Sequence, residues 1–438
     1  MPSLQYQGSK PDPALEPLLT DIETFLQTAL CSFAPEPQRS ERRGRPAIIP
    51  HLCLWSGLLV CVLRGFSQQL SLWRMLYLGK LWHYPRFPIS DEAVYKRLER
   101  ADIKPLQALF QHISQLLQQR LEVWSTCALA PFAAEVLALN ETTLDQVARY
   151  LPSLRQVPQG DERLLPGKLS ALFDLRRQQW RTIEYQEKPH QNKKVAARQM
   201  VSNLPKYSLV LADLGYFGFE WFDWLTEQSY WWVSRLREKT SYTLLHSFFE
   251  EGDTKDQLIW LGAYRADQAA HAVRLVQFRV GKHLHRYITN VTEPQQLPII
   301  EIARLYARRW DIELAFKTLK VHLKLHLLWS AKNQVILQQV WATLIIAQIL
   351  QAFQMEIAGR AGVDPFEVSL ALMIEYLPQF AYDGNDPLES FIKYGREVRF
   401  IRPSTRTKIL APTPDWDLYK PLPPDLCFIR KPRYAHKP

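Results

Sequence analysis

The sequence is poor in cysteine, and its most apolar run is short. Its 438 residues include five cysteines, none of them in a Cys-x-x-Cys pair, which argues against a disulfide framework and against a zinc ribbon. The most apolar stretch, residues 52–63, is well short of the roughly 20 residues that span a bilayer. Residues 1–13 are polar and lack the apolar segment of a signal peptide. We therefore expect a cytoplasmic protein with no membrane partner.

The charge balance is basic. The chain has 54 Lys and Arg against 44 Asp and Glu, a net charge of +10, and a pI near 9.2. Such a balance is compatible with a polyanionic partner such as a nucleic acid, although many soluble proteins share it. Basic residues gather in a Pro-flanked linker that contains Arg42, Arg43 and Arg45, and in a Pro-rich C-terminal tail, 386–438. We expect both segments to contact DNA or a protein partner.

The first third of the chain, residues 1–130, is predicted to be all-helical. Apolar residues recur at helical spacing over 15–30, 51–63, 70–81 and 106–123. A further helix follows Ser90, which has the residue type of an N-cap and precedes two acids. Its expected outward face carries Lys96, Arg97 and Arg100. With the helix before it, this is either a helix-turn-helix pair that enters a DNA groove or a solvated amphipathic helix.

The pattern changes near residue 131 to short apolar runs typical of buried strands. Three strands are followed in turn by a helix, a strand, a helix and a strand, with the strands at 136–139, 168–173, 180–185, 207–213 and 230–236 and the helices at 193–203 and 218–227. This is the element order of an RNase H-like mixed sheet, so the predicted fold class is α+β.

The remaining boundaries follow from the same patterns. Residues 131–236 form the first part of the expected core, and the alternating segment 237–298 indicates a β-rich insertion. Helical spacing returns over 299–385, the second part of the core, and the tail 386–438 follows. No internal repeat or low-complexity tract interrupts this organisation.

Four polar residues of the first helix after the insertion are spaced to share one face. Tyr306, Arg309, Glu313 and Lys320 stand at offsets that project within an arc of about 60° on a regular helix. A carboxylate between two cations suits a site where a metal meets DNA phosphates, with Glu313 on the metal and both cations on phosphate oxygens. The alternative is a solvated helix face with an Arg309–Glu313 ion pair.

A second acidic residue lies at the end of a buried strand. Asp213 closes the strand 207–213 and is followed by Gly215, Tyr216 and Phe217. A side chain in this position points out of the sheet edge where ligands bind in open sheets. The alternative is an aspartate that only caps the turn after it.

Together these residues resemble the Asp-Asp-Glu (DDE) transposases of the fourth numbered bacterial insertion-sequence family. That family is recognised by a Tyr-x2-Arg-x3-Glu-x6-Lys signature, which is complete here and follows an Ala-Asp-x-Gly-Tyr-Phe strand end. The resemblance covers roughly residues 130 to 360 and includes the β-rich insertion. It implies an RNase H-like catalytic core preceded by a helical domain, 1–130, that binds DNA ends.

The resemblance also implies cut-and-paste transposition. In such enzymes the carboxylates hold two Mg²⁺ ions, for which Mn²⁺ can substitute, and a freed 3′-hydroxyl attacks the opposite strand to form a hairpin that is later joined to target DNA. Tyr306, Arg309 and Lys320 are then expected to position phosphates, as are the basic residues of the N-terminal region. The implied partners are double-stranded DNA, as transposon-end inverted repeats and as target, and a second copy in a homodimer. A bacterial, nucleoid-associated location follows from these partners.

Residue 140 departs from the family pattern. The family's first catalytic aspartate ends the first core strand, and this chain has Asn140 there. Asparagine keeps the shape and one acceptor oxygen but loses the charge that two bridged metal ions need. Neither Glu141, which should face the other side of the strand, nor Asp145, beyond the strand end, is an obvious replacement. Three explanations fit this residue: an engineered change that traps a DNA complex, natural decay in a dead element, or a domesticated protein that only binds DNA.

Overall fold

The computed structural model describes residues 20–33, 48–121, 129–144, 156–158, 161, 166–264, 267–382 and 386–434. The chain divides into two compact units. Unit 1 comprises 1–124, 143–167 and 316–403, and unit 2 comprises 125–142, 168–315 and 404–438. This division differs from the expected domains, because the segment 299–385 is split between the units and its later helices fall in unit 1.

The described part of unit 1 is built from helices. They are α1 (Thr20–Ser32), α2 (His51–Leu63), α3 (Gln69–Leu78), α4 (Asp91–Arg100), α5 (Lys104–Leu121), α10 (Asn333–Ala361), α11 (Leu370–Tyr382) and α12 (Pro387–Tyr394). Helix α10 contacts α2, α4, α5 and α12, so it forms the core of this unit. It is long and apolar enough to cross a membrane, but 94% of its most apolar window is buried within the protein, as in a core helix. The sequence-based prediction that no segment spans a membrane considered only the shorter apolar run over α2.

Helix α4 begins as predicted, and its basic residues differ in exposure. Ser90 caps it, with its hydroxyl oxygen accepting from the Ala93 N–H at 3.2 Å. Lys96 is exposed and pairs with Glu92 at 2.8 Å. Arg97 is less exposed than Lys96, because this side chain is partly buried and desolvation lowers its pKa. Packing of the helix against its neighbours therefore covers part of Arg97.

The described part of unit 2 contains a nine-stranded mixed sheet in the order β3-β2-β1-β4-β5-β9-β8-β7-β6. Strands β1, β4 and β5 are parallel, whereas β2 and β3 form a hairpin and β6 to β9 form an antiparallel meander. The strands are β1 (Val136–Leu144), β2 (Gly167–Asp174), β3 (Gln179–Gln186), β4 (Leu209–Ala212), β5 (Trp231–Arg235), β6 (Tyr242–Glu251), β7 (Thr254–Leu261), β8 (Val273–Val280) and β9 (His283–Thr289).

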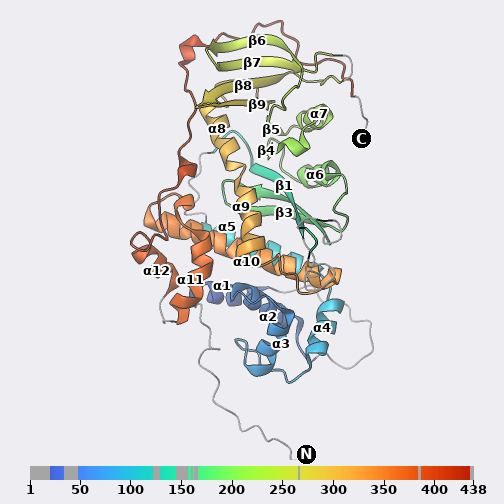
Figure 1. The fold of residues 1–438 in the computed structure, drawn as a ribbon, viewed down its shortest axis with the longest axis vertical. Coiled ribbons are helices and arrows are strands. Elements are labelled where there is room, and N and C mark those ends of the chain that lie inside the picture. The colour runs from blue at the N-terminus through green and yellow to red at the C-terminus, as the bar shows by residue number, and fades with distance from the viewer. Residues whose placement is uncertain are drawn as a thin grey trace, which may run out of the picture. The chain divides into compact units, whose positions relative to one another are not determined.

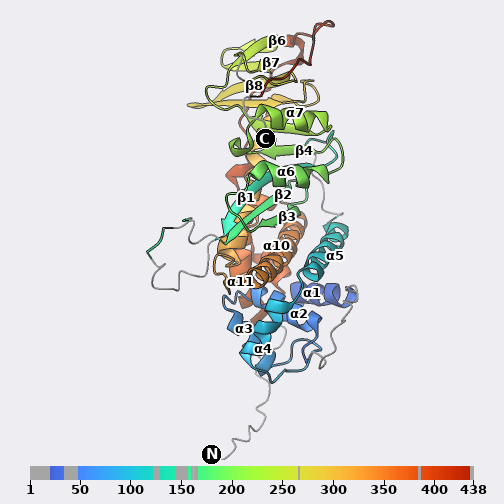
Figure 2. The ribbon, with the colours of Figure 1, turned by 90° about the vertical axis from the view of Figure 1, so that its right-hand side faces the viewer.

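The order of strands and helices over 136–235 is the predicted one. Strand β4 is the continuous apolar run Leu-Val-Leu-Ala because both of its faces are covered. Helices α6 (Lys193–Ser202) and α7 (Phe219–Glu227) lie on one side of the sheet, and α8 (Ile299–Arg308) lies on the other (Figures 1 and 2). The four strands β6 to β9 extend the same sheet through antiparallel pairing of β9 with β5.

The end of the chain packs onto unit 2 instead of forming a free arm. Arg430 donates to the carbonyl oxygens of Leu261, Gly262 and Ala269 at 2.6–3.2 Å. Farther along, the Tyr434 hydroxyl donates to Asp223 of α7 at 2.7 Å. Although the tail is basic, part of its positive charge is therefore used inside the fold.

Candidate functional site

Two of the predicted site residues lie side by side at one edge of the sheet of unit 2. Strands β1 and β4 are parallel, and Leu139 is paired with Ala212. The next residues along the two strands are Asn140 and Asp213. The common direction of the strands brings the amide and the carboxylate to neighbouring positions. The side-chain oxygen of Asn140 accepts from the N–H of Glu141 at 2.9 Å.

Asp213 caps a turn and also stands near a cation. Its Oδ1 accepts from the Gly215 N–H at 2.8 Å, which begins the 3₁₀ turn Leu214–Tyr216. A Cβ atom added at Gly215 would lie 2.2 Å from the Lys193 Nζ and 2.9 Å from this same oxygen. Gly215 thus leaves room for the lysine ammonium group to approach Asp213.

Glu141, the next residue of β1, is paired with lysines. Its carboxylate lies 3.0 Å from the buried Lys168 of β2 and 3.9 Å from Lys193. Lys193 is also the cation that approaches Asp213 beside Gly215. Two ammonium groups thus occupy the Glu141 carboxylate, and Asp145 lies outside the described residues.

The structure brings three of the four signature residues into contact. The Arg309 Nη1 donates to Glu313 Oε1 at 2.8 Å, and its guanidinium carbon lies 5.4 Å from the centre of the Tyr306 ring. Tyr306 packs on Tyr287 with 4.8 Å between ring centres. Burial raises the pKa of the Tyr306 hydroxyl, so this group stays protonated at neutral pH. The ion pair foreseen as an alternative does form, with Arg309 buried and Glu313 partly exposed.

The regular helix assumed for the signature is wrong. Helix α8 ends at Arg308, and a turn at Arg309 and Trp310 separates it from α9 (Asp311–Lys317). The chain then continues as a π-helical turn over Thr318–His322. Lys320 belongs to this turn and to unit 1, where its Nζ donates to the Thr143 carbonyl oxygen at 3.0 Å. The four signature residues therefore do not share one face of a single helix.

Two charged residues next to the signature were missed. Asp311 is fully buried, and it accepts from the Arg308 Nε at 2.7 Å and from the Gln178 Nε2 at 2.8 Å. Burial raises the pKa of its carboxyl group while the cation of Arg308 opposes that rise. Arg235 ends β5 with its guanidinium carbon 5.9 Å from the Tyr306 ring centre. Its place at the end of an apolar strand was the signal that could have identified it.

The donor groups do not match the metal site that the resemblance implies. Among the described residues, no group of three or more His, Cys, Asp and Glu side chains is arranged to hold an ion. The sheet edge and α9 supply two carboxylates, Asp213 and Glu313, with the neutral amide of Asn140 in the third position. One of the two carboxylates is already paired with Arg309. This set is one charge short of three carboxylates on two divalent ions.

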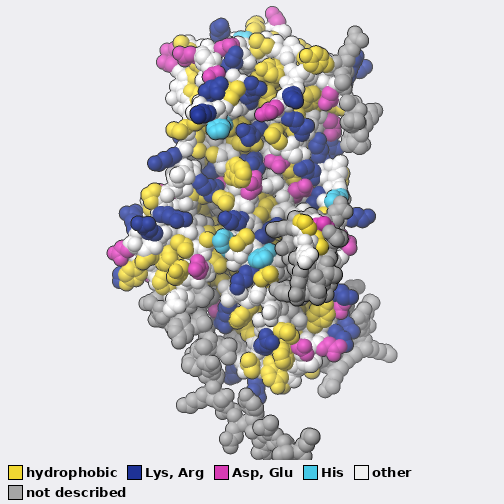
Figure 3. All heavy atoms as spheres, in the orientation of Figure 1, with side chains coloured by type: hydrophobic (Ala, Val, Ile, Leu, Met, Phe, Trp, Pro, Cys, Tyr) yellow, Lys and Arg dark blue, Asp and Glu magenta, His cyan; other side chains and the backbone are white. Residues whose placement is uncertain are grey.

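The remaining predicted residues lie elsewhere. Arg42, Arg43 and Arg45 are outside the described residues. On the face shown in Figure 3, Lys and Arg side chains are frequent in the region of β8 and β9 of unit 2. Exposed cations of this unit include Arg235, Arg237, Lys239, Arg279, Lys282 and Arg286.

Fold and site define an α+β protein with acids and cations at one end of two parallel strands, and parts of its sequence match known proteins. Residues 159–350 match the family model described as the transposase DDE domain. This range contains Asp213 and the whole signature but not Asn140. The chain is 21% identical to the transposase of insertion sequence element IS231B of Bacillus thuringiensis subsp. berliner, over 59% of this chain and 64% of that protein. It thus spans just under two thirds of that relative.

A second relative is the transposase of element IS231F of Bacillus thuringiensis subsp. israelensis. It is 22% identical over 70% of this chain and 73% of that protein. The chain is therefore similar in sequence to two insertion-sequence transposases and to a model of the transposase DDE domain. Among solved structures, a piggyBac transposase synaptic complex with hairpin DNA covers 90% of this chain and 86% of its own at 10% identity. Its TM-score of 0.40 is too low to establish a shared fold.

Proposed function

We propose that this protein is a DDE transposase that binds the ends of an insertion sequence and that lacks the first catalytic carboxylate. The observation that carries the proposal is the register of β1 and β4, which sets Asn140 beside Asp213 at one sheet edge. The alternative within the same class is a catalytically dead or domesticated DNA-binding protein. Both rest on the same scaffold and differ in what one residue does.

The topology supports an RNase H-like core. A β2–β3 hairpin lies beside β1, the parallel strands β4 and β5 follow in the order β1-β4-β5, and α8 covers the opposite face from α6 and α7. The helical segment that bears Glu313 comes after this sheet in the chain. In chain order, position 140 on β1, Asp213 after β4 and Glu313 on α9 correspond to the order of the three acids of the DDE class.

Each site residue has a proposed role in DNA cleavage and joining through a hairpin. Asp213 and Glu313 are the metal-ligating carboxylates, and position 140 is the third. Because Asn140 leaves the set incomplete for two Mg²⁺ or Mn²⁺ ions, we assign no cleavage step to the sequence in this form. Tyr306 and Arg309 would contact the DNA backbone, and Lys320 is proposed for the same role.

The proposed partners are double-stranded DNA and a second copy of the chain. Helices α3 and α4 pack against each other in unit 1, as a helix-turn-helix pair requires. Lys96 remains a candidate DNA contact on this pair, whereas the partial burial of Arg97 makes a direct contact less favourable. We propose that the linker arginines bind phosphates and that a homodimer pairs two transposon ends before joining them to target DNA.

The test is an Asn140→Asp variant on a duplex that carries the terminal repeat found beside the gene. Cleavage is compared in Mg²⁺ and in Ca²⁺, with Asn203→Asp as a control that adds the same charge at the exposed end of α6. We expect all three proteins to bind the duplex and only Asn140→Asp with Mg²⁺ to nick it and form hairpins. The gain should be about a thousandfold, which corresponds to about 4 kcal/mol of transition-state stabilisation.

Two outcomes would contradict this assignment. Equal cleavage by the original protein and by Asn140→Asp would show that another residue supplies the third ligand. No cleavage by either protein, with end binding intact, would favour the DNA-binding alternative.

A further inference from the structure

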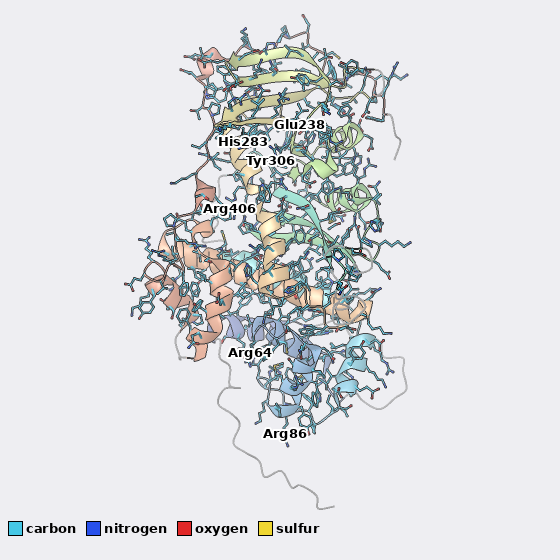
Figure 4. All side chains as sticks on the ribbon, in the orientation of Figure 1. Arg64, Arg86, Glu238, His283, Tyr306 and Arg406 are labelled. Atoms are coloured by element: carbon cyan, nitrogen blue, oxygen red, sulfur yellow. The ribbon has the colours of Figure 1, made fainter. Side chains whose placement is uncertain are left out.

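The C-terminal segment reaches the start of the helix that carries Glu313. Arg406 lies in a short turn, Thr405–Thr407, and its Nη2 donates to Asp311 Oδ1 within unit 2. Figure 4 shows Arg406 beside the helical segment that continues from Tyr306. The two partners are 95 residues apart in the chain. The side chain of Asp311 is fully buried, whereas that of Arg406 is 29% exposed.

Helix α9 depends on such contacts for its position. It has seven residues, too few for a helix to be stable on its own. Asp311 is its first residue and stands two positions from both Arg309 and Glu313. Because Asp311 and Glu313 are two residues apart in this seven-residue helix, a contact that fixes Asp311 also restrains the backbone that carries Glu313.

The same segment is attached at its other end to α7. Its Tyr434 hydroxyl donates to Asp223 Oδ2 at 2.7 Å, and Asp223 also accepts from the backbone N–H groups of Ala270 and His271 at 2.7 and 3.0 Å. Asp223 lies on α7, the first α-helix after Asp213. Residues 406–434 are thus attached at one end to Asp311 of α9 and at the other end to Asp223 of α7.

We infer that residues 404–434 form a C-terminal strap that holds α9 in place, with Arg406 as a positioning residue for Glu313. Arg406 acts through Asp311 and touches no reacting atom. Its catalytic consequence rests on the proposed function, whereas its effect on α9 does not. The strap accounts for Arg406 and Arg430, two basic residues near the end of the chain that donate to groups within the fold.

The direct test is amide hydrogen exchange of residues 308–316 in the full chain. In Arg406→Gln we expect these amides to open about tenfold more often, since a charge-assisted hydrogen bond is removed from a buried carboxylate. Arg433→Gln is the matched control, because that arginine lies in the same strap and is exposed. Arg406→Lys, which keeps the charge, should restore most of the protection. Unchanged exchange in Arg406→Gln, or an equal fall in protection in Arg433→Gln, would overturn the inference.

A kinetic readout separates positioning from general stability. In the Asn140→Asp background, Arg406→Gln should lower the cleavage rate of bound DNA about tenfold while end affinity stays within about twofold. A parallel fall in affinity and rate would overturn the positioning role. If Asn140→Asp itself does not cleave, the proposed function fails, and the exchange experiment still decides whether the strap holds α9.

Discussion

Two carboxylates in α9, Asp311 and Glu313, have opposite surroundings. Asp311 is fully buried and contacts Gln178, Arg308 and Arg406, whereas the Glu313 side chain is 28% exposed and pairs with Arg309. A buried carboxylate with several partners holds chain segments together, and a half-exposed one keeps oxygen atoms accessible to a ligand. The local sequence does not distinguish them, because both are acids in the first turn of a helix.

The β-rich insertion contains the same contrast in two ion pairs. Asp256 and Arg274 are fully buried, with the carboxylate bridged by two guanidinium nitrogens at 2.6 and 2.7 Å. Asp253 and Arg279 are equally close, 2.6 Å apart, but about half exposed. Burial, and not distance, therefore decides how much structure depends on each pair.

The largest expected effect is on the buried pair. Asp256→Asn should lower the free energy of unfolding by about 3–5 kcal/mol, because it leaves Arg274 charged and unpaired in the interior. Asp253→Asn is the control and should change stability little. Urea denaturation of both variants measures the difference. An equal loss of stability in the two variants would show that burial does not distinguish these pairs.

The next effect concerns Glu313. In the Asn140→Asp background, Glu313→Gln should reduce Mg²⁺-dependent cleavage about a thousandfold, since only two of the three charged ligands remain. End binding should stay within a few-fold and thermal stability should be nearly unchanged. Asp311→Asn should instead lower the melting temperature. Loss of folding in Glu313→Gln would show that its pair with Arg309 is structural.

A smaller effect is expected from the basic linker. Replacing Arg42, Arg43 and Arg45 together by Gln should weaken binding similarly on transposon-end DNA and on random DNA. The slope of log affinity against log salt should fall by about 0.9 for each DNA phosphate that the variant no longer neutralises. An unchanged slope would show that these arginines do not contact DNA.

The smallest effect is expected at Gly215. Gly215→Ala places a methyl group 2.2 Å from the Lys193 Nζ, the mobile end of a long side chain, so it should cost less than about 1 kcal/mol of stability. Moving the ammonium group away from Asp213 should change cleavage by Asn140→Asp by only a few-fold. A large drop in stability would show that Lys193 is held as firmly as the buried pairs.

Periodicity and residue type were sufficient to predict much of this protein. The apolar spacing of 51–63 predicted the bounds of α2, Ser90 marked the start of α4, and the apolar runs predicted the order of β1 to β5. These features depend on interactions between residues close in the chain, which the sequence displays directly. The register of β1 and β4 comes from the structure: Leu139 pairs with Ala212, and β1 continues to Leu144 beyond the end of β4.

Long-range contacts decided the rest. The break between α8 and α9, the partly buried Arg97 and the C-terminal strap depend on partners that are distant in the chain, such as Arg406 and Asp311. Local patterns carry no information about such partners, since an acid in a first helical turn looks the same in the sequence whether solvent or two arginines surround it. The local sequence identified Glu313 as a candidate ligand, and only tertiary packing separated it from Asp311.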